Sequence, residues 1–201
     1  DTVESGRGTD IVELQGGEDV ATHVGGSLAV DGGGGLDRLQ IAAQPAGFAT
    51  LDLGTGLPQV LDIGDRDDLL ARRGQLAQVI DAVSAGDEVV LGYEGGGVAF
   101  SRSEQVIASG DRAADLLVSG SEGGVLSGDG GQDILIGAAG NDVLIGGRGR
   151  DAYVMGRDMG EDTILGEGDE PLEIHLIGRD LDDARFATDA AQRDLTIRFD
   201  G

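Results

Sequence analysis

The chain has 201 residues with 38 acidic against 14 basic side chains, and because Lys is absent every basic residue is Arg. The formal net charge of −24 repels nucleic acids and anionic lipid surfaces, so we expect neither as a partner. The absence of Cys excludes disulfides, thiolate zinc sites and cysteine nucleophiles.

Glycine is the commonest amino acid, with 38 residues, whereas aromatic residues make up 3% of the chain and Trp is absent. A conventional aromatic-rich core is therefore not expected. No apolar run is long enough to span a membrane, and the first residues do not resemble a signal peptide. Because the chain has no initiator Met and ends directly after a strand-like segment, we expect it to be part of a larger protein.

A degenerate repeat of nine residues occupies residues 1–40, the first block, and its units begin at residues 5, 14, 23 and 32. Each unit combines a polar turn with a short strand. The sixth position ends the turn, and in the four units it is Asp10, Asp19, Leu28 and Asp37. The eighth position, which we expect to face the interior, is Val12, Ala21, Val30 and Leu39.

Residues 41–109 form a connector in which this register is lost, because the spacing between Asp37 and Asp115 is not a multiple of nine. Alternating apolar residues predict short strands at 49–53, 60–63, 88–93 and 97–100. Residues 65–83 have a helical pattern that ends before Gly86, although Gly74 weakens it by about 1 kcal/mol relative to Ala. The apolar face of this predicted helix consists of Leu69, Leu76, Ile80 and Val83.

The clearest repeat runs over residues 110–165, the second block, in which five consecutive units begin at residues 110, 119, 128, 137 and 146. The last unit, GGRGRDAYV, matches the pattern G-G-x-G-x-D-x-U-x at every defined position, where U is a large apolar residue. The sixth positions are Asp115, Gly124, Asp133, Asp142 and Asp151, and the eighth positions are Leu117, Leu126, Leu135, Leu144 and Tyr153. After a slip of two residues, Asp162 and Ile164 continue both series.

Residues 166–201 have the features of a cap, which a solenoid needs to cover its last open coil. Apolar segments at 172–177 and 195–199 predict strands, and the Asp-rich segment between them is predicted to hold one helical turn. The predicted fold is therefore all-β: a parallel β-roll with a mixed connector that contains a short helix, and a C-terminal β cap.

Two units make one full turn of a parallel β-helix, so equivalent residues of alternate units stack on the same side. This spacing pairs the sixth positions as 115/133, 133/151, 142/162 (across the slip), 124/142, 19/37 and 10/28. Stacked turns rich in glycine bring backbone carbonyls close together, and these dipoles repel one another unless a cation lies between them. Calcium accepts about 6–8 carbonyl and carboxylate oxygens, so the pattern predicts calcium sites, weaker where one partner lacks a carboxylate.

The stretch GDGGQDILIGAAGNDVLIGGRGRDAYVMG (128–156) resembles the RTX, or haemolysin-type, calcium-binding repeat. Residues 103–120 and 183–201 are similar to segments that precede and follow such blocks. The resemblance implies that loop carbonyls and sixth-position carboxylates coordinate calcium. The predicted metal residues are Asp10, Asp19, Asp37, Asp115, Gly128, Gly130, Asp133, Gly137, Ala139, Asp142, Gly146, Arg148, Asp151 and Asp162.

Other readings of these residues require features that the sequence lacks. A flexible acidic linker would not have a phased apolar eighth position, a phosphate loop would end in Gly-Lys-Ser/Thr, and an EF-hand would have a Glu at its twelfth position. His23 and His175 are predicted to be surface or strand residues rather than ligands or bases. The adjacent carboxylates at 67/68 and 182/183 are predicted to be helix N-terminal or solvated charges, and Tyr153 a packing residue.

The function expected from this resemblance is that of a calcium-binding repeat region of a secreted, extracellular bacterial protein, without enzymatic activity. It would stay unfolded at low calcium, leave the cell through type I secretion machinery, and fold as a monomer on extracellular calcium. The parent would be a cytolysin, adenylate cyclase toxin or adhesin with a virulence role. Two alternatives remain open: an accessory module of a secreted protease, lipase or epimerase, and a receptor-binding segment, in which the connector would contact the host cell.

Overall fold

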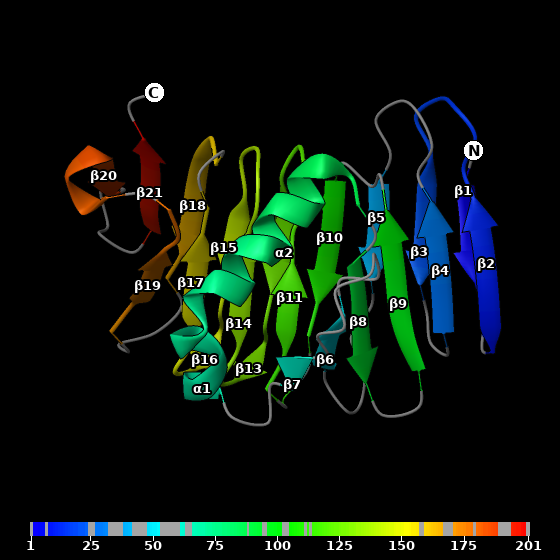
Figure 1. Cartoon of the computed structure of the whole chain (residues 1–201), viewed down its shortest axis with the longest axis horizontal. Helices are drawn as coiled ribbons and strands as arrows, with labels where there is room; N and C mark the ends of the chain where they lie inside the picture. Colours follow the sequence, from blue (N-terminus) through cyan, green and yellow to red (C-terminus); the bar gives the residue numbers. More distant parts are fainter. Residues whose placement is uncertain are drawn as a thin grey trace.

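The strands of this chain stack side by side along one axis, with the two termini at opposite ends (Figure 1). The structure is a computed structural model. It describes residues 2–6, 8–23, 27–31, 38–41, 48–52, 61–62, 66–87, 89–93, 96–101, 105–110, 112, 114–156, 159–166, 171–178, 180–188 and 194–199. The chain forms a parallel β-solenoid, because it alternates between two facing layers of strands as it advances.

One layer is a single sheet of nine strands, which we call the long sheet. Seven of its strands are mutually parallel: β1 (Thr2–Ser5), β3 (Val20–His23), β5 (Arg38–Ile41), β10 (Gln105–Ser109), β12 (Gly124–Ser127), β15 (Val143–Ile145) and β18 (Glu161–Leu165). The last two are antiparallel, namely β21 (Asp194–Phe199) and the edge strand β20 (Ala184–Thr188). Both repeat blocks therefore contribute to one continuous sheet.

The facing layer is divided into two sheets. The N-terminal sheet contains the parallel strands β2 (Thr9–Glu13), β4 (Ser27–Asp31) and β9 (Gly96–Ser101), followed by the antiparallel strands β8 (Val89–Tyr93), β6 (Phe48–Asp52) and β7 (Leu61–Asp62). The helix-side sheet consists of β11 (Leu116–Val118), β14 (Ile134–Gly137), β17 (Ala152–Met155) and β19 (Glu173–Leu176), all parallel. Two short strands in the turns, β13 (Gly130–Gly131) and β16 (Arg148–Gly149), also pair in parallel.

The register confirms the parallel β-roll that the repeat predicts. Leu117 pairs with Leu135 and Leu126 with Leu144, so each eighth position meets its equivalent two repeat units later. The two-residue slip is accommodated in the next coil, where Leu144 pairs with Ile164. The eighth-position leucines of the second block are fully buried, so one inward apolar side chain per strand forms the thin core.

The junction between the two blocks is a direct strand pairing across the connector. Leu39 in β5 pairs with Val106 in β10, although almost the whole connector separates the two residues along the chain. Within the intervening segment β6, β7 and β8 add antiparallel strands to the N-terminal sheet, and β9 and β10 then continue the two layers in parallel. The loss of the nine-residue register in the sequence thus corresponds to an insertion between neighbouring coils.

The connector contains two helices where the sequence predicts one, α1 (Arg66–Ala71) and α2 (Arg73–Ala85). The break lies at Arg72, whose ψ of 53° is not helical, close to the glycine that weakens the predicted helix. Helix α2 ends at Gly86, in the left-handed conformation with φ 74°, as predicted. Its apolar face buries Leu76, Val79, Ile80 and Val83, and the side chain of Leu69 lies outside the described residues.

Helix α2 crosses the outer face of the helix-side sheet (Figure 1). The contact is close at Gly156, where a Cβ would lie 2.5 Å from Cγ2 of Ile80. Every residue of β11, β14 and β17 is buried, whereas β12 and β15 of the long sheet each bury a single residue, Leu126 and Leu144. The insertion therefore covers one side of the second block and leaves the other side more open.

The C-terminal segment covers the last coil of the long sheet, because β21 pairs antiparallel with β18. The strands predicted at 172–177 and 195–199 correspond to β19 and β21, and the single helical turn is the 3-10 helix η1 (Leu181–Asp183). Strand β20 was not predicted. Four of its five residues are exposed, so it carries no alternating apolar signal and depends on its backbone pairing with β21.

Candidate metal centre

The sixth positions of the second block form two columns, one along each edge of the solenoid. The first column contains Asp115, Asp133 and Asp151, which precede β11, β14 and β17. The second column contains Gly124, Asp142 and Asp162, at or next to the starts of β12, β15 and β18. All five carboxylates are buried, with exposed fractions between 0% and 7%.

A ladder of hydrogen bonds connects each column. The peptide N–H of Asp115 donates to Oδ1 of Asp133 at 2.8 Å, and that of Asp133 donates to Oδ1 of Asp151 at 3.0 Å. In the second column the N–H of Asp142 donates to Oδ1 of Asp162 at 3.0 Å, across the two-residue slip. The structure thus brings together the predicted pairs 115/133, 133/151 and 142/162. In each pair, Oδ1 of the second residue accepts a hydrogen bond from the peptide N–H of the first.

The second carboxylate oxygen points toward the first glycine of its own unit. A Cβ at Gly128 would collide with Oδ2 of Asp133 and would lie 2.7 Å from the carbonyl oxygen of Gly146. A Cβ at Gly110 would meet Oδ2 of Asp115 in the same way and the carbonyl of Gly128 at 2.8 Å. First-position glycine is therefore required by close approach, because carboxylate and carbonyl oxygens of adjacent coils converge on the space that a side chain would fill.

In the second column, the carboxylates of Asp142 and Asp162 converge on the space beside Gly137, and we call such a glycine-lined space a cradle. A Cβ at Gly137 would lie 3.0 Å from Oδ2 of Asp142 and 3.3 Å from Oδ2 of Asp162. Within the described part of the chain, neither Oδ2 atom has a hydrogen-bond partner. Two acidic oxygens thus share a buried, glycine-lined space in which none of the described residues donates a hydrogen bond to either of them.

The electrostatics of this pair oppose ionisation in the absence of a cation. Burial raises the pKa of Asp142 to about 7, although hydrogen bonds from Ser119 and the N–H of Gly124 act against the shift. Burial, followed by repulsion from Asp142, raises the pKa of Asp162 to about 8. A cation between the two would favour the charged form of both groups.

The donor set fits a hard cation. It consists of carboxylate and carbonyl oxygens, which suit calcium or magnesium, and it offers neither the imidazole nor the thiolate that zinc and copper prefer. Among the described residues no group of three or more His, Cys, Asp or Glu side chains could hold a metal. An ion bound at the Asp142–Asp162 pair would therefore need backbone carbonyls or water as its remaining ligands.

The other predicted loop residues line the turns. Gly130 pairs with Arg148 through β13 and β16, and Arg148 donates its N–H to the carbonyl of Asp129 at 3.0 Å. Ala139 is 8% exposed and precedes Gly140, which forms an isolated bridge to Met159. These contacts keep successive turns in register.

The first block lacks the carboxylate pairs in its described part. Asp10 lies opposite Leu28, and its buried Oδ2 has no hydrogen-bond partner among the residues described. Asp19 is 5% exposed and accepts the N–H of Arg38 at its carbonyl, at 2.9 Å. Asp37 lies outside the described residues, so the predicted 19/37 pair is not described.

His23 lies in a strand, one of its two predicted locations, but it is fully buried. It occupies the first position of its unit, and its Nδ1 lies 3.1 Å from the hydroxyl of Ser5, the first position one coil earlier. Burial lowers the pKa of His23, and the negative charge of Asp10 acts in the opposite direction. At these two first positions the first block thus has hydrogen-bonded side chains where the second block has glycine.

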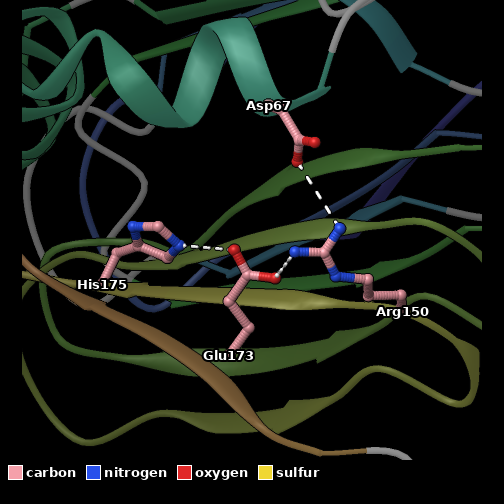
Figure 2. A network of polar contacts seen from close by, with 4 residues as sticks. All are labelled: Asp67, Arg150, Glu173 and His175. Carbon is pink, nitrogen blue, oxygen red and sulfur yellow. Dashed lines mark hydrogen bonds and ion pairs between the residues drawn. The ribbon is translucent and has the colours of Figure 1, made fainter.

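The second histidine belongs to a polar network at the other end of the molecule (Figure 2). Glu173 bonds Nε2 of His175 at 3.0 Å and Nη2 of Arg150 at 2.9 Å, and Nη1 of Arg150 lies 3.9 Å from Oδ1 of Asp67. Asp67 is in the first turn of α1, where the sequence predicts helix N-terminal charge. The network joins a turn of the first column to β19 and, through exposed side chains, to the connector.

The sequence reasoning missed Ser119 and part of the role of Tyr153. The hydroxyl of Ser119 donates to Oδ1 of Asp142. Tyr153 packs in the interior as predicted, and its hydroxyl also accepts the N–H of Gly146 at 3.1 Å. A signal for Ser119 was present in the sequence, because its unit departs from the pattern at the first and the sixth position together.

No protein-family model matches the chain, and no curated protein matches its sequence significantly. None of the described helices has the length and apolar character needed to cross a membrane.

Proposed function

We propose that this chain is a calcium-binding repeat region of the RTX kind, which folds into its β-roll when calcium fills the turns of the second block. The observation that carries the proposal is the cradle at Gly137. There, two buried carboxylate oxygens without hydrogen-bond partners in the described part of the chain, from Asp142 and Asp162, lie 3.0 and 3.3 Å from the same point.

The reason for a cation is electrostatic. An ionised carboxylate loses several kcal/mol of hydration when it is buried, and a second carboxylate beside it adds repulsion. Calcium would neutralise both charges and bind the two Oδ2 atoms, to which the described residues donate no hydrogen bond. In the first column, Asp115, Asp133 and Asp151, with the carbonyls of Gly128 and Gly146, would hold ions in the same way.

Calcium binding would then be coupled to folding. The sites exist only when consecutive coils are stacked, so the free energy of binding contributes to the free energy of folding. Extracellular calcium modules have dissociation constants of about 10⁻⁴–10⁻³ M, so their sites fill outside the cell and stay empty in the cytosol. Self-repulsion at a net charge of −24 would also keep the calcium-free chain extended.

In this proposal the region acts outside the cell, as a non-catalytic part of a secreted protein. An extended, calcium-free chain suits export through a narrow type I secretion channel, and folding afterwards would present the activity of the parent protein. The accessory-module and receptor-binding roles remain alternatives for the same region.

The test is a calcium titration of the whole chain, followed by circular dichroism and calorimetry. We expect little β structure in EDTA and a cooperative gain at about 10 mM calcium, well above a dissociation constant of about 10⁻³ M. Asp142→Asn should weaken binding at one site. Asp129→Asn is the matched control, since Asp129 is an exposed residue of the same block and the charge change is the same. Equal spectra in EDTA and calcium would refute the proposal.

A further inference from the structure

One unit of the second block, residues 119–127, departs from its neighbours at two linked positions. It has Ser119 where the other four units have glycine, and Gly124 where they have aspartate. In the other units the aspartate requires the glycine, because a first-position Cβ would lie no more than 3.0 Å from Oδ2 of the aspartate. With Ser119 at the first position and Gly124 at the sixth, this unit avoids a steric clash between the two positions, and it has no sixth-position carboxylate.

The side chain of Ser119 fills the space that a sixth-position carboxylate would otherwise occupy. Ser119 is fully buried, and a Cβ on Gly124 would lie 3.0 Å from its Oγ. The same Cβ would also collide with the backbone carbonyl of Val106, which is paired with Gly124 across β10 and β12. The junction strand β10 thus approaches too closely for an aspartate at position 124.

The hydroxyl of Ser119 satisfies one side of Asp142. It donates to Oδ1, while Oδ2 of the same carboxylate faces Oδ2 of Asp162 near Gly137. The two oxygens of Asp142 therefore have different environments, one with a protein hydroxyl and the other with a second carboxylate. Only the second environment calls for a cation.

We propose, on the basis of the calcium-binding function above, that Ser119 replaces a calcium ion at the 124/142 position. The coil of residues 119–127 then folds against β10 without an ion of its own in the second column. Strand β12 of this coil can therefore pair with β15 without a bound ion, and the 142/162 site forms next to that pairing. The second column would hold one ion, between Asp142 and Asp162, rather than two.

The test counts bound calcium by native mass spectrometry in the whole chain and in three variants. Ser119→Ala should bind as many ions as the parent and melt at a lower temperature, because Asp142 loses a hydrogen-bond donor. Asp142→Asn should lose one ion. Ser127→Ala is the control for the serine substitution, since Ser127 lies in the same coil but outside the turn, and it should change neither quantity.

Loss of an ion in Ser119→Ala would mean that the hydroxyl is a calcium ligand, and it would overturn the inference. Loss of two ions in Asp142→Asn would do the same, because it would place a second ion at 124/142. A parent chain that binds no calcium would instead refute the proposed function, so the two failures are distinguishable.

Discussion

The two repeat blocks share one register and one sheet but differ inside their turns. In both blocks the strands of alternate units pair in parallel, and the apolar side chains of Ala21 and Leu39 face the interior as those of Leu126 and Leu144 do. In the second block the turns enclose stacked carboxylates beside glycines. In the described part of the first block, two first positions at the ends of β1 and β3 are instead Ser5 and His23, whose side chains share a hydrogen bond.

This difference shows that the nine-residue period encodes two separable properties. The strand with its inward eighth position determines the solenoid, because it supplies the core and the backbone ladder. The first and sixth positions determine what the turn encloses, which is a carboxylate cradle only when glycine and aspartate occur together. A coil can lose the second property and keep the first, as the coil that joins Ser5 to His23 does.

The largest expected effect is the removal of calcium. At calcium about 100 times the dissociation constant each site adds about 2.7 kcal/mol of stability, so chelation should remove several times this from the second block. We expect hydrogen exchange in EDTA to accelerate at least about 100-fold in β14 and β15, and less in β1, β3 and β5. Equal acceleration in both blocks would show that their turns do not differ in calcium dependence.

Alanine in place of a cradle glycine should have the next largest effect. Gly128→Ala forces a Cβ against the carboxylate of Asp133, so we expect a loss of at least about 1–3 kcal/mol and weaker calcium binding. Gly6→Ala in the first block is the matched control, because no atom lies within 4 Å of its added Cβ. It should change the free energy of unfolding by less than about 0.5 kcal/mol. Similar losses in urea unfolding would contradict the cradle geometry.

Acid should affect the two calcium-free blocks in opposite directions. Asp142 and Asp162 have pKa values of about 7 and about 8 in the folded chain against 3.8 in the unfolded chain, so folding binds protons. The stabilisation of the folded state by these two bound protons is fully present below about pH 4 and is lost as the pH rises through 7 to 8. The pKa of His23 is instead lowered from 6.5, so the first block loses stability as the pH falls below that value.

This prediction is checked in EDTA with a stabilising osmolyte, which favours the folded state of the calcium-free chain, by hydrogen exchange at pH 8 and pH 5, corrected for intrinsic exchange rates. Protection should rise in β15 and β18 and fall in β1 and β3 at the lower pH. The double variant Asp142→Asn, Asp162→Asn is the control, since it should abolish the gain in the second block and leave the first block unchanged. If protection in β15 and β18 rose by the same amount in the double variant, the effect would come from a general decrease in charge repulsion and not from Asp142 and Asp162.

The smallest effect is expected where the connector meets the second block through exposed charges. The Arg150–Asp67 pair spans 3.9 Å with side chains 58% and 70% exposed, so Asp67→Asn should cost less than about 1 kcal/mol. Thermal unfolding at low and high salt measures this. A larger, salt-dependent loss would mean that the ion pair, rather than the apolar face of α2, holds the connector on the roll.

Much of the solenoid could be read from the sequence because its contacts are periodic. Each coil contacts mainly its neighbours, so a fixed spacing between residues is also a fixed spacing in space. This is why the pairs 115/133, 133/151 and 142/162 could be named before their geometry was known. The end of α2 at Gly86 could also be predicted, because a left-handed helix cap depends only on residues close in sequence.

The remaining features depend on contacts that have no period. The pairing of Leu39 with Val106 bridges the whole insertion, and the docking of Ile80 on Gly156 joins a helix to a distant coil. Nothing local to these residues specifies the partner. The exclusion of a side chain at Gly124 by the carbonyl of Val106 follows from that same junction, and with it the place of Ser119 beside Asp142. Neighbour spacing along the chain thus specified the repeated coils, whereas the insertion and the coil beside it took their form from long-range packing.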